Sequence, residues 1–213
     1  MEYIFTFCWG WFVSFAGQLP LGTMSITSAQ IAVEENFRNA WKYSLGVALI
    51  EIVYLRFTLS GVDWIIQHKL IFEILGWTTV AVFLVLGILT FRAALKQTEE
   101  KKAYLLNNNL NRYILGITMS ALNPAQIPFW FIWSSALIDS NALHTTTTDF
   151  NLFTAGAGLG TISGLAFYMY GGNWIITKMK AGTKIINIIM GVIFIIAALA
   201  QLYRMLFGEF IEK

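Results

Sequence analysis

Charged residues, cysteines and histidines are all scarce in this sequence. Only 12% of its 213 residues are charged, whereas about a quarter of a soluble domain is charged, and the mean hydropathy is +0.63. The single cysteine, Cys8, excludes an internal disulfide, and two histidines, His68 and His144, give little basis for a metal site. A net charge of +2 without a basic face does not favour nucleic acid. The composition predicts a membrane protein with no cofactor, no metal and no nucleic-acid partner.

Hydrophobic stretches account for nearly the whole chain. A membrane-spanning helix needs roughly 20 apolar residues, and six such stretches are separated by short polar connections: 3–33, 41–59, 70–95, 113–137, 151–176 and 185–207. We therefore expect an all-α polytopic protein that forms one transmembrane domain over residues 1–213. The acidic Glu2 stands where a signal peptide carries positive charge, so the first stretch is expected to be retained.

Lysine and arginine are unevenly divided between the two sides of the predicted membrane. If the N-terminus is outside, ten of these residues lie on the inner connections and three on the outer side. Because cytoplasmic loops are enriched in basic residues, both termini are expected outside. The longest inner connection, 96–112, is then a cytoplasmic linker between the halves 1–95 and 113–213. With three spans each, the halves enter the membrane in opposite directions, which predicts a 3+3 inverted repeat.

A polar, proline-bearing passage interrupts the first span and recurs in the fourth. Residues 17–31 read GQLPLGTMSITSAQI, and residues 115–127 read LGITMSALNPAQI. Proline breaks helices, so the first and fourth spans are expected to be broken near mid-membrane. Each new helix start would present free N–H groups and a positive dipole end, which suit a carboxylate. A matched pair of broken helices is typical of transporters with a substrate site between two repeats.

Glu51 stands near the centre of the second span, where a carboxylate costs about 2.5 to 3.5 kcal/mol. It is expected to face the bundle interior and to accept a substrate ammonium or carry a coupling proton. A structural ion pair with Arg56 is the alternative, although Arg56 also suits Glu73. Hydroxyl and amide groups near the two breaks add polar contacts. The candidate substrate-binding residues are Gln18, Pro20, Gly22, Thr23, Ser25, Gln30, Glu51, Asn123, Pro124 and Gln126.

Three glycines recur at every fourth position of the fifth span: Gly156, Gly160 and Gly164. This spacing places them on one helix face, where they allow another helix to approach closely. We expect the partner helix to lie within the chain, and the same face leaves a homo-oligomer open. No strand pattern precedes the glycines, which argues against a nucleotide-binding loop.

Together these motifs resemble the lysine exporter family, the LysE/RhtB type of small bacterial amino-acid exporters. The resemblance covers nearly the whole chain and rests on Pro20-Leu21-Gly22, Gly46 with Glu51, Leu86-Gly87, Asn123-Pro124 followed by Phe129-Trp130, and Gly191. The family usually shows Pro-Gly-Pro at the first motif, and a basic or small residue rather than Ala125-Gln126 after Asn-Pro, so the substrate stays open. The resemblance implies gradient-driven export of an amino acid or similar metabolite across the bacterial cytoplasmic (inner) membrane.

Other functions fit parts of the pattern. A divalent-cation exporter of similar fold would need several oxygen ligands, but Glu51 is the only acid at mid-depth. A membrane scaffold without transport would use Pro20 and Pro124 only as kinks in packed helices, with the hydroxyls bonded to their own backbone. An enzyme is disfavoured because no Ser-His, paired Asp or His-Glu constellation lies at the required depth. Whether protons or sodium ions drive export stays open.

Overall fold

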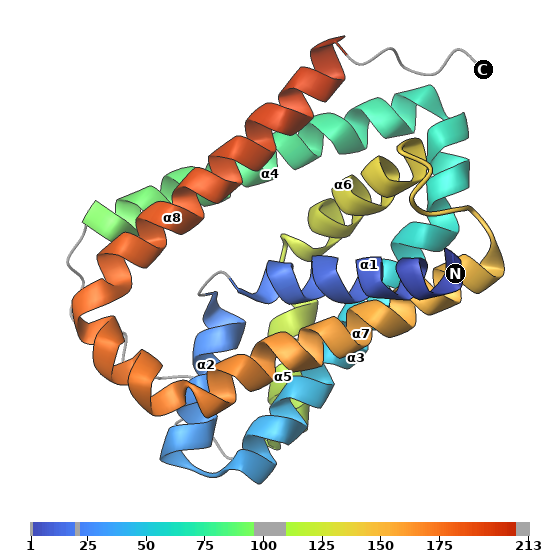
Figure 1. Ribbon diagram of the computed structural model, residues 1–213. Helices are drawn as coiled ribbons and strands as arrows, with labels where there is room; N and C mark the ends of the chain where they lie inside the picture. The colour runs from blue at the N-terminus through green and yellow to red at the C-terminus, as the bar shows by residue number, and fades with distance from the viewer. Residues whose placement is uncertain (1, 20–21, 96–109, 208–213) are drawn as a thin grey trace.

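The computed structural model describes residues 2–19, 22–95 and 110–207 (Figure 1). Within these ranges the chain forms eight α-helices and no strand, which confirms the predicted all-α class. The helices are α1 (Glu2–Gln18), α2 (Thr23–Glu34), α3 (Phe37–Gln67), α4 (Lys69–Leu95), α5 (Arg112–Ala121), α6 (Gln126–Asp139), α7 (Thr147–Tyr170) and α8 (Gly172–Phe207). Most of the predicted linker, 96–109, and Pro20 lie outside the described residues.

Several boundaries differ from the predicted spans. The second predicted span, 41–59, is part of the longer helix α3, and the largest difference follows α7. The predicted connection 177–184 is wrong, because these residues lie inside α8, and α7 ends at Tyr170 rather than at 176. The lysines in this stretch do not stop a helix, since lysine is a good helix former. The chain instead turns at Gly171, whose N–H bonds to the carbonyls of Met169 and Phe167 as the α7 C-cap.

Several helices have the length and composition of membrane spans. Three stretches qualify: Phe37–Gly61 of α3, Glu73–Arg92 of α4 and the whole of α7. The pair α1 and α2, which is bent by 78°, forms a fourth span if the two helices are taken together. Large apolar side chains project from these helices, and Phe5, Phe57 and Phe167 are more than half exposed. Such surfaces suit hydrocarbon rather than water. The chain is therefore a multi-pass membrane protein.

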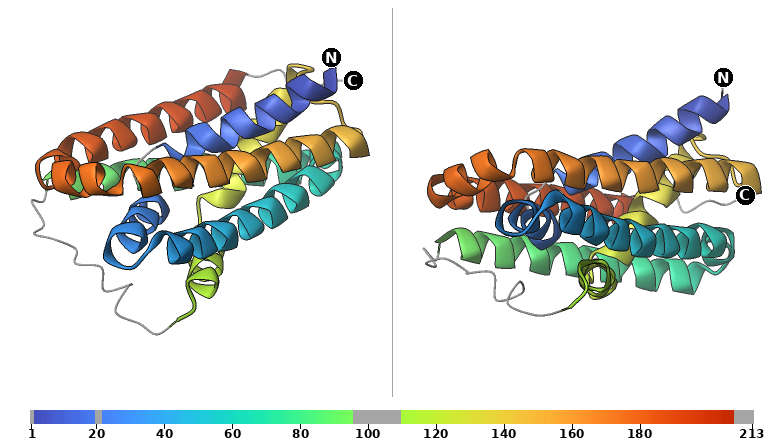
Figure 2. Two further views of the ribbon diagram at one scale, coloured as in Figure 1. Left: turned by 60° about the horizontal axis from the view of Figure 1, so that its bottom comes forward. Right: turned by 90° about the horizontal axis from the view of Figure 1, so that it is seen from below.

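The helices pack in matching pairs. α1 lies along α7 as α5 lies along α3, while α2 also contacts α7 and α6 contacts α3. α3 and α7 meet each other, and α4 and α8 run side by side in every view (Figures 1 and 2). Each of these contacts has a counterpart when the two sets of helices are exchanged. In that exchange α1 corresponds to α5, α2 to α6, α3 to α7 and α4 to α8.

The first and fourth predicted spans are both interrupted, as expected. α1 and α2 are separated by residues 19–22, and α5 and α6 by residues 122–125. The repeated Thr-Met-Ser triplet does not mark equivalent positions, because Thr23-Met24-Ser25 follows the first break whereas Thr118-Met119-Ser120 precedes the second. The two breaks correspond when Pro20 is aligned with Pro124, since proline is what prevents the helix from continuing.

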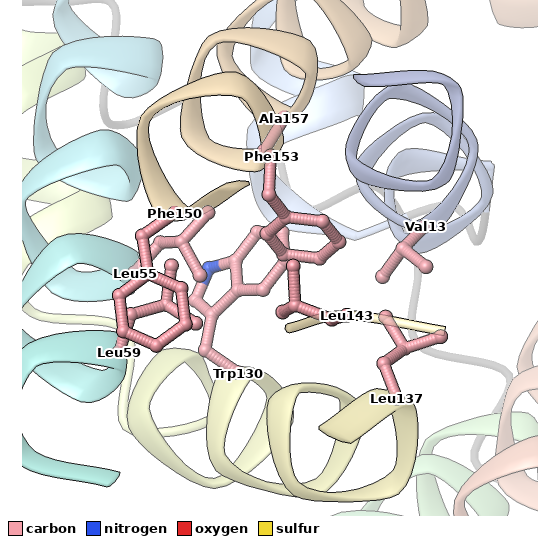
Figure 3. Close-up of a cluster of buried hydrophobic side chains, with 9 residues drawn as sticks. All are labelled: Val13, Leu55, Leu59, Trp130, Leu137, Leu143, Phe150, Phe153 and Ala157. Carbon is pink, nitrogen blue, oxygen red and sulfur yellow. The ribbon is translucent and has the colours of Figure 1, made fainter. Parts of the chain in front are cut away.

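Two apolar clusters lie on either side of a polar layer. The α6–α7 cluster (Figure 3) consists of Val13, Leu55, Leu59, Trp130, Leu137, Leu143, Phe150, Phe153 and Ala157. The α2–α3 cluster consists of Ile31, Ala32, Ala40, Tyr43, Val47, Leu115, Leu165 and Met169. Along α3, Glu51 lies between the two clusters, and along α7 the same place is taken by Thr161.

The glycine stripe of α7 is packed against α1. A Cβ atom at Gly156 would lie 2.1 Å from the carbonyl oxygen of Phe7, and one at Gly160 would lie 2.3 Å from that of Trp11. Only glycine permits so close an approach of two backbones. The prediction that these glycines pack within the chain is confirmed. The contact holds α1, from Phe7 onward, against the middle of α7.

Candidate functional site

Glu51 is the centre of the polar layer and is only 5% exposed. Its Oε2 accepts hydrogen bonds from Thr161 Oγ1 at 2.7 Å and from Gln18 Nε2 at 3.0 Å. Its Oε1 accepts one from Ser14 Oγ at 3.4 Å. No ion pair involves Glu51 within the described residues, so the alternative pairing with Arg56 does not form. The expectation that Glu51 faces the bundle interior is confirmed.

Helix geometry explains how these donors reach Glu51. Ser14 and Gln18 are four residues apart and therefore lie on one face of α1. Thr161 follows Gly160, one of the positions where α1 and α7 approach closely, and its hydroxyl lies 2.8 Å from Ser14 Oγ. Ser14 and Thr161 are absent from the candidates derived from the sequence. The four-residue spacing from Ser14 to Gln18, and a hydroxyl next to a packing glycine, are the signals that would have indicated them.

The first break is tied to this centre through Gln18. Ser25 Oγ donates a hydrogen bond of 3.0 Å to the backbone oxygen of Gln18, and Tyr168 donates one to the backbone oxygen of Leu19. α2 begins at Thr23 after Gly22, and no side chain caps this start. Of the other candidates on α2, Thr23 is exposed and Gln30 is half-buried, and neither bonds to Glu51.

The second break contacts α3 on both sides of Glu51. Ser120 Oγ donates to the Val47 carbonyl at 3.3 Å, one turn before Glu51, and Tyr54 donates to the Ala121 carbonyl at 2.8 Å, nearly one turn after it. The amide of Gln126 donates to Ser120 Oγ at 2.8 Å. The second break therefore lies at the level of Glu51 on α3, although none of its side chains bonds to the carboxylate itself.

Asn123 lies in the second break, just before Ala125, the N-cap of α6. Its Oδ1 accepts a hydrogen bond of 3.1 Å from the N–H of Ala125. The expectation that Pro124 begins the new helix with Asn123 as its N-cap is wrong, because α6 begins at Gln126 and no side chain caps that start. Pro124 borders a cavity of about 220 Å³ between α4 and α6, which is mainly apolar and also contacts Thr78 and Thr79. The break thus has the Glu51 layer on one side and this cavity on the other.

An ion pair joins the two halves at the end of the bundle where α2 meets α3. Arg112 Nη2 lies 2.6 Å from Glu35 Oε1, and Asn39 also donates to Glu35. Burial raises the pKa of Glu35, but the hydrogen bonds from Arg112 and Asn39 and the charge of Arg112 outweigh it and lower the pKa. Within the described residues, no three His, Cys, Asp or Glu side chains gather in a way that would hold a metal ion.

Among the predicted candidates, Gln18 donates a hydrogen bond to Glu51, and Ser25 donates one to the backbone oxygen of Gln18. Asn123, Pro124 and Gln126 form a separate group at the second break. Comparison with known proteins finds one family. Residues 15–205 match the family described as LysE type translocator, and this range includes both breaks, Glu51 and Thr161. No curated protein matches the chain, and no solved structure does.

Proposed function

Since the chain belongs to the LysE type translocator family, it carries a small molecule across a membrane, and we propose that this molecule is an amino acid or a similar small metabolite, exported from the cell. The buried Glu51 carboxylate, held only by neutral donors, carries the proposal. A carboxylate without a cation partner in an apolar bundle has a strong affinity for a positive group. The ammonium of an amino acid is such a group.

The proposed architecture is a single transmembrane domain over residues 1–213 with six spans. The first repeat consists of three spans: the broken pair α1–α2, then α3 and α4. The second, inverted repeat consists of the broken pair α5–α6, then α7 and α8. The matched helix contacts support this assignment, because they persist when the two sets are exchanged. The end of the bundle where α2 meets α3 carries Arg38, Lys42 and Arg112. Because cytoplasmic ends are enriched in basic residues, this end is assigned to the cytoplasm and both termini to the outside of the inner membrane.

The cargo would lie between the two breaks and Glu51. Its ammonium would replace the Gln18 amide or the Thr161 hydroxyl at the Glu51 carboxylate. Its carboxylate would bind the free N–H groups at the start of α2, which no side chain caps. Gln18 connects the two ends of this site, because its side chain bonds to Glu51 and its backbone accepts from Ser25.

Coupling to an ion gradient follows from the same carboxylate. After the cargo leaves, an ionised Glu51 without a cation is costly in a membrane. Binding of a proton or another small cation from outside removes that cost and allows the empty carrier to return. Glu51 thus exchanges cargo for the driving ion, so that export is driven by the gradient.

The test is efflux of amino acids from proteoliposomes. A panel of the twenty standard amino acids, radiolabelled, identifies the cargo, and metabolite profiling of cells with and without the protein covers other compounds. Glu51→Gln keeps the shape of the side chain but removes its charge. A hydrogen bond to a charged group contributes about 1.5–3 kcal/mol, so efflux should fall at least about tenfold. Glu34→Gln, at an exposed acid on α2, is the control and should leave efflux unchanged.

Either of two results would contradict the proposal. Efflux by Glu51→Gln at the normal rate and with the normal pH dependence would make Glu51 a structural residue. Wild-type vesicles and cells that move no amino acid or related metabolite would remove the proposed cargo class. Circular dichroism of each variant verifies that a loss of efflux does not come from unfolding.

A further inference from the structure

Three hydrogen-bond donors are buried without a partner in the half of the bundle near the α6–α7 connection. They are Nη1 of Arg56, Nε1 of Trp130 and Oγ of Ser134, and none bonds to any residue that the structure describes. Trp130 and Ser134 are each 0% exposed. An unsatisfied buried donor is costly, and a charged one more so, which makes three in one region unusual.

Helix periodicity places two of these donors on one face of α6. Trp130 and Ser134 are four residues apart, and Leu137 continues the same face. Trp130 and Leu137 both belong to the α6–α7 cluster. Figure 3 shows the indole nitrogen of Trp130 directed toward the side of the cluster where Phe150 and Leu55 lie. The donors of α6 thus point into the bundle rather than toward lipid.

Arg56 borders the same cluster from α3. It stands between Leu55 and Leu59, which are cluster members, and its Cζ lies 5.9 Å from the ring centroid of Phe150. The guanidinium lies over the Phe150 ring, and Trp130 contacts Phe153 of the same cluster edge to face. One positive charge on α3 and the Trp130 donor on α6 therefore border the same apolar cluster, and Ser134 stands between the cluster members Trp130 and Leu137 on α6.

The acidic side chains near Arg56 are already engaged elsewhere. Glu51 accepts from Ser14, Gln18 and Thr161, and Asp149 accepts from the hydroxyls of Thr6 at 3.2 Å and Thr146 at 2.7 Å. The pairing of Arg56 with Glu73 suggested by the sequence does not form. Around the cluster, a guanidinium, an indole N–H and a hydroxyl thus have no partner among the described residues. A buried acceptor also lacks a partner there: Oε1 of Gln126, which lies one turn before Trp130 on α6.

We infer that Arg56, Trp130 and Ser134 form a second subsite that binds a small anion, and that its occupant is the carboxylate of the cargo on its way out. The inference rests on the proposed function for the identity of the anion. A guanidinium with an N–H and an O–H donor suits a carboxylate, which has several acceptor positions. Arg56 is five residues after Glu51, about 7.5 Å along α3. The cargo thus passes from Glu51 to Arg56 toward the α6–α7 end.

The subsite is tested by binding to the purified protein, which does not depend on transport. Thermal unfolding is followed while sodium acetate, and separately sodium chloride, is titrated at equal sodium concentration. Acetate should raise the unfolding temperature with saturation. Arg56→Gln should raise the acetate concentration at half-saturation at least about tenfold, and Ser134→Ala should raise it about threefold. Ser135→Ala is the matched control, because that hydroxyl bonds to the Ile132 carbonyl and to Arg204.

Further variants keep the outcomes distinct. If Arg56→Gln does not fold, Ser134→Ala and Trp130→Phe decide the question. Glu51→Gln should keep the acetate response, so failure of the proposed transport mechanism does not imply failure of the subsite. A response to acetate but not to chloride supports the cargo carboxylate, whereas equal responses keep the anion site and overturn its assignment to cargo. No saturable response, or one that Arg56→Gln and Ser134→Ala leave unchanged, overturns the subsite.

Discussion

Thr161 donates a hydrogen bond of 2.7 Å to Oε2 of Glu51, which lies 110 residues earlier in the chain. The bond connects the middle of α7 to the middle of α3. It is the shortest of the three that hold the carboxylate, and Thr161 also lies 2.8 Å from Ser14 of α1. Three helices therefore meet at one oxygen-rich point between two apolar clusters.

Removing this hydroxyl should impair transport without unfolding the protein. Thr161→Val keeps the shape of the side chain but leaves Oε2 of Glu51 with Gln18 as its remaining donor. A hydrogen bond to a charged group contributes about 1.5–3 kcal/mol, so efflux of the amino acid identified in the vesicle panel should fall at least about tenfold. Thr161→Ser keeps the hydroxyl and should stay within about threefold of the wild-type rate. Equal rates for Thr161→Val and wild type would exclude Thr161 from the site.

The packing of α1 on α7 gives a second prediction, on stability. Gly156→Ala places a methyl group against the backbone oxygen of Phe7, which cannot move without displacing α1. The unfolding free energy should fall by about 1–3 kcal/mol, as measured by denaturation in detergent. In Gly158→Ala the new methyl meets only the side chain of Ile52, at Cδ1 and Cγ1, which can move without displacing a backbone, and the change should be below about 1 kcal/mol. Equal losses in both variants would contradict the close backbone contact.

Local signals in the sequence were sufficient to predict the fold class and the two breaks. Hydrophobic stretches and prolines act on the chain where they stand, so the all-α class and the interruptions near Pro20 and Pro124 follow from them. The connection predicted at 177–184 is wrong because charged residues do not by themselves end a helix. Lysine is compatible with helix, and the actual turn is made by Gly171.

The polar centre was only partly predictable. The free-energy cost of a carboxylate inside a membrane indicated Glu51. The positions of Gln18 and Ser25 near the first proline indicated those two residues. Thr161 gives no comparable signal, because a lone hydroxyl in an apolar helix often bonds to its own backbone, as Thr161 also does with the Ala157 carbonyl. Its contact with Glu51 depends on how α1, α3 and α7 pack, which a residue pattern within one helix does not contain.

A third prediction concerns the ion pair between Arg112 and Glu35, which joins the start of α5 to the end of α2. Because the pKa of Glu35 in the folded protein is below its ordinary value of 4.5, ionised Glu35 favours the folded state. By linkage, this stabilisation is present above about pH 4.5 and is lost as the pH falls through the lower, folded pKa. A pair at the surface is worth about 0.2–1 kcal/mol.

Arg112→Gln should therefore lower the unfolding temperature of the purified protein by about 1–3 °C at pH 7. The difference from wild type should shrink as the pH falls below 4.5, because protonation of Glu35 removes the attraction in the wild type as well. Arg38→Gln is the matched control, since Arg38 is an exposed arginine at the same end of the bundle, and it should change the unfolding temperature little at any pH. A difference for Arg112→Gln that is the same at pH 7 and at acid pH would show that Arg112 stabilises the fold through contacts other than the charge of Glu35.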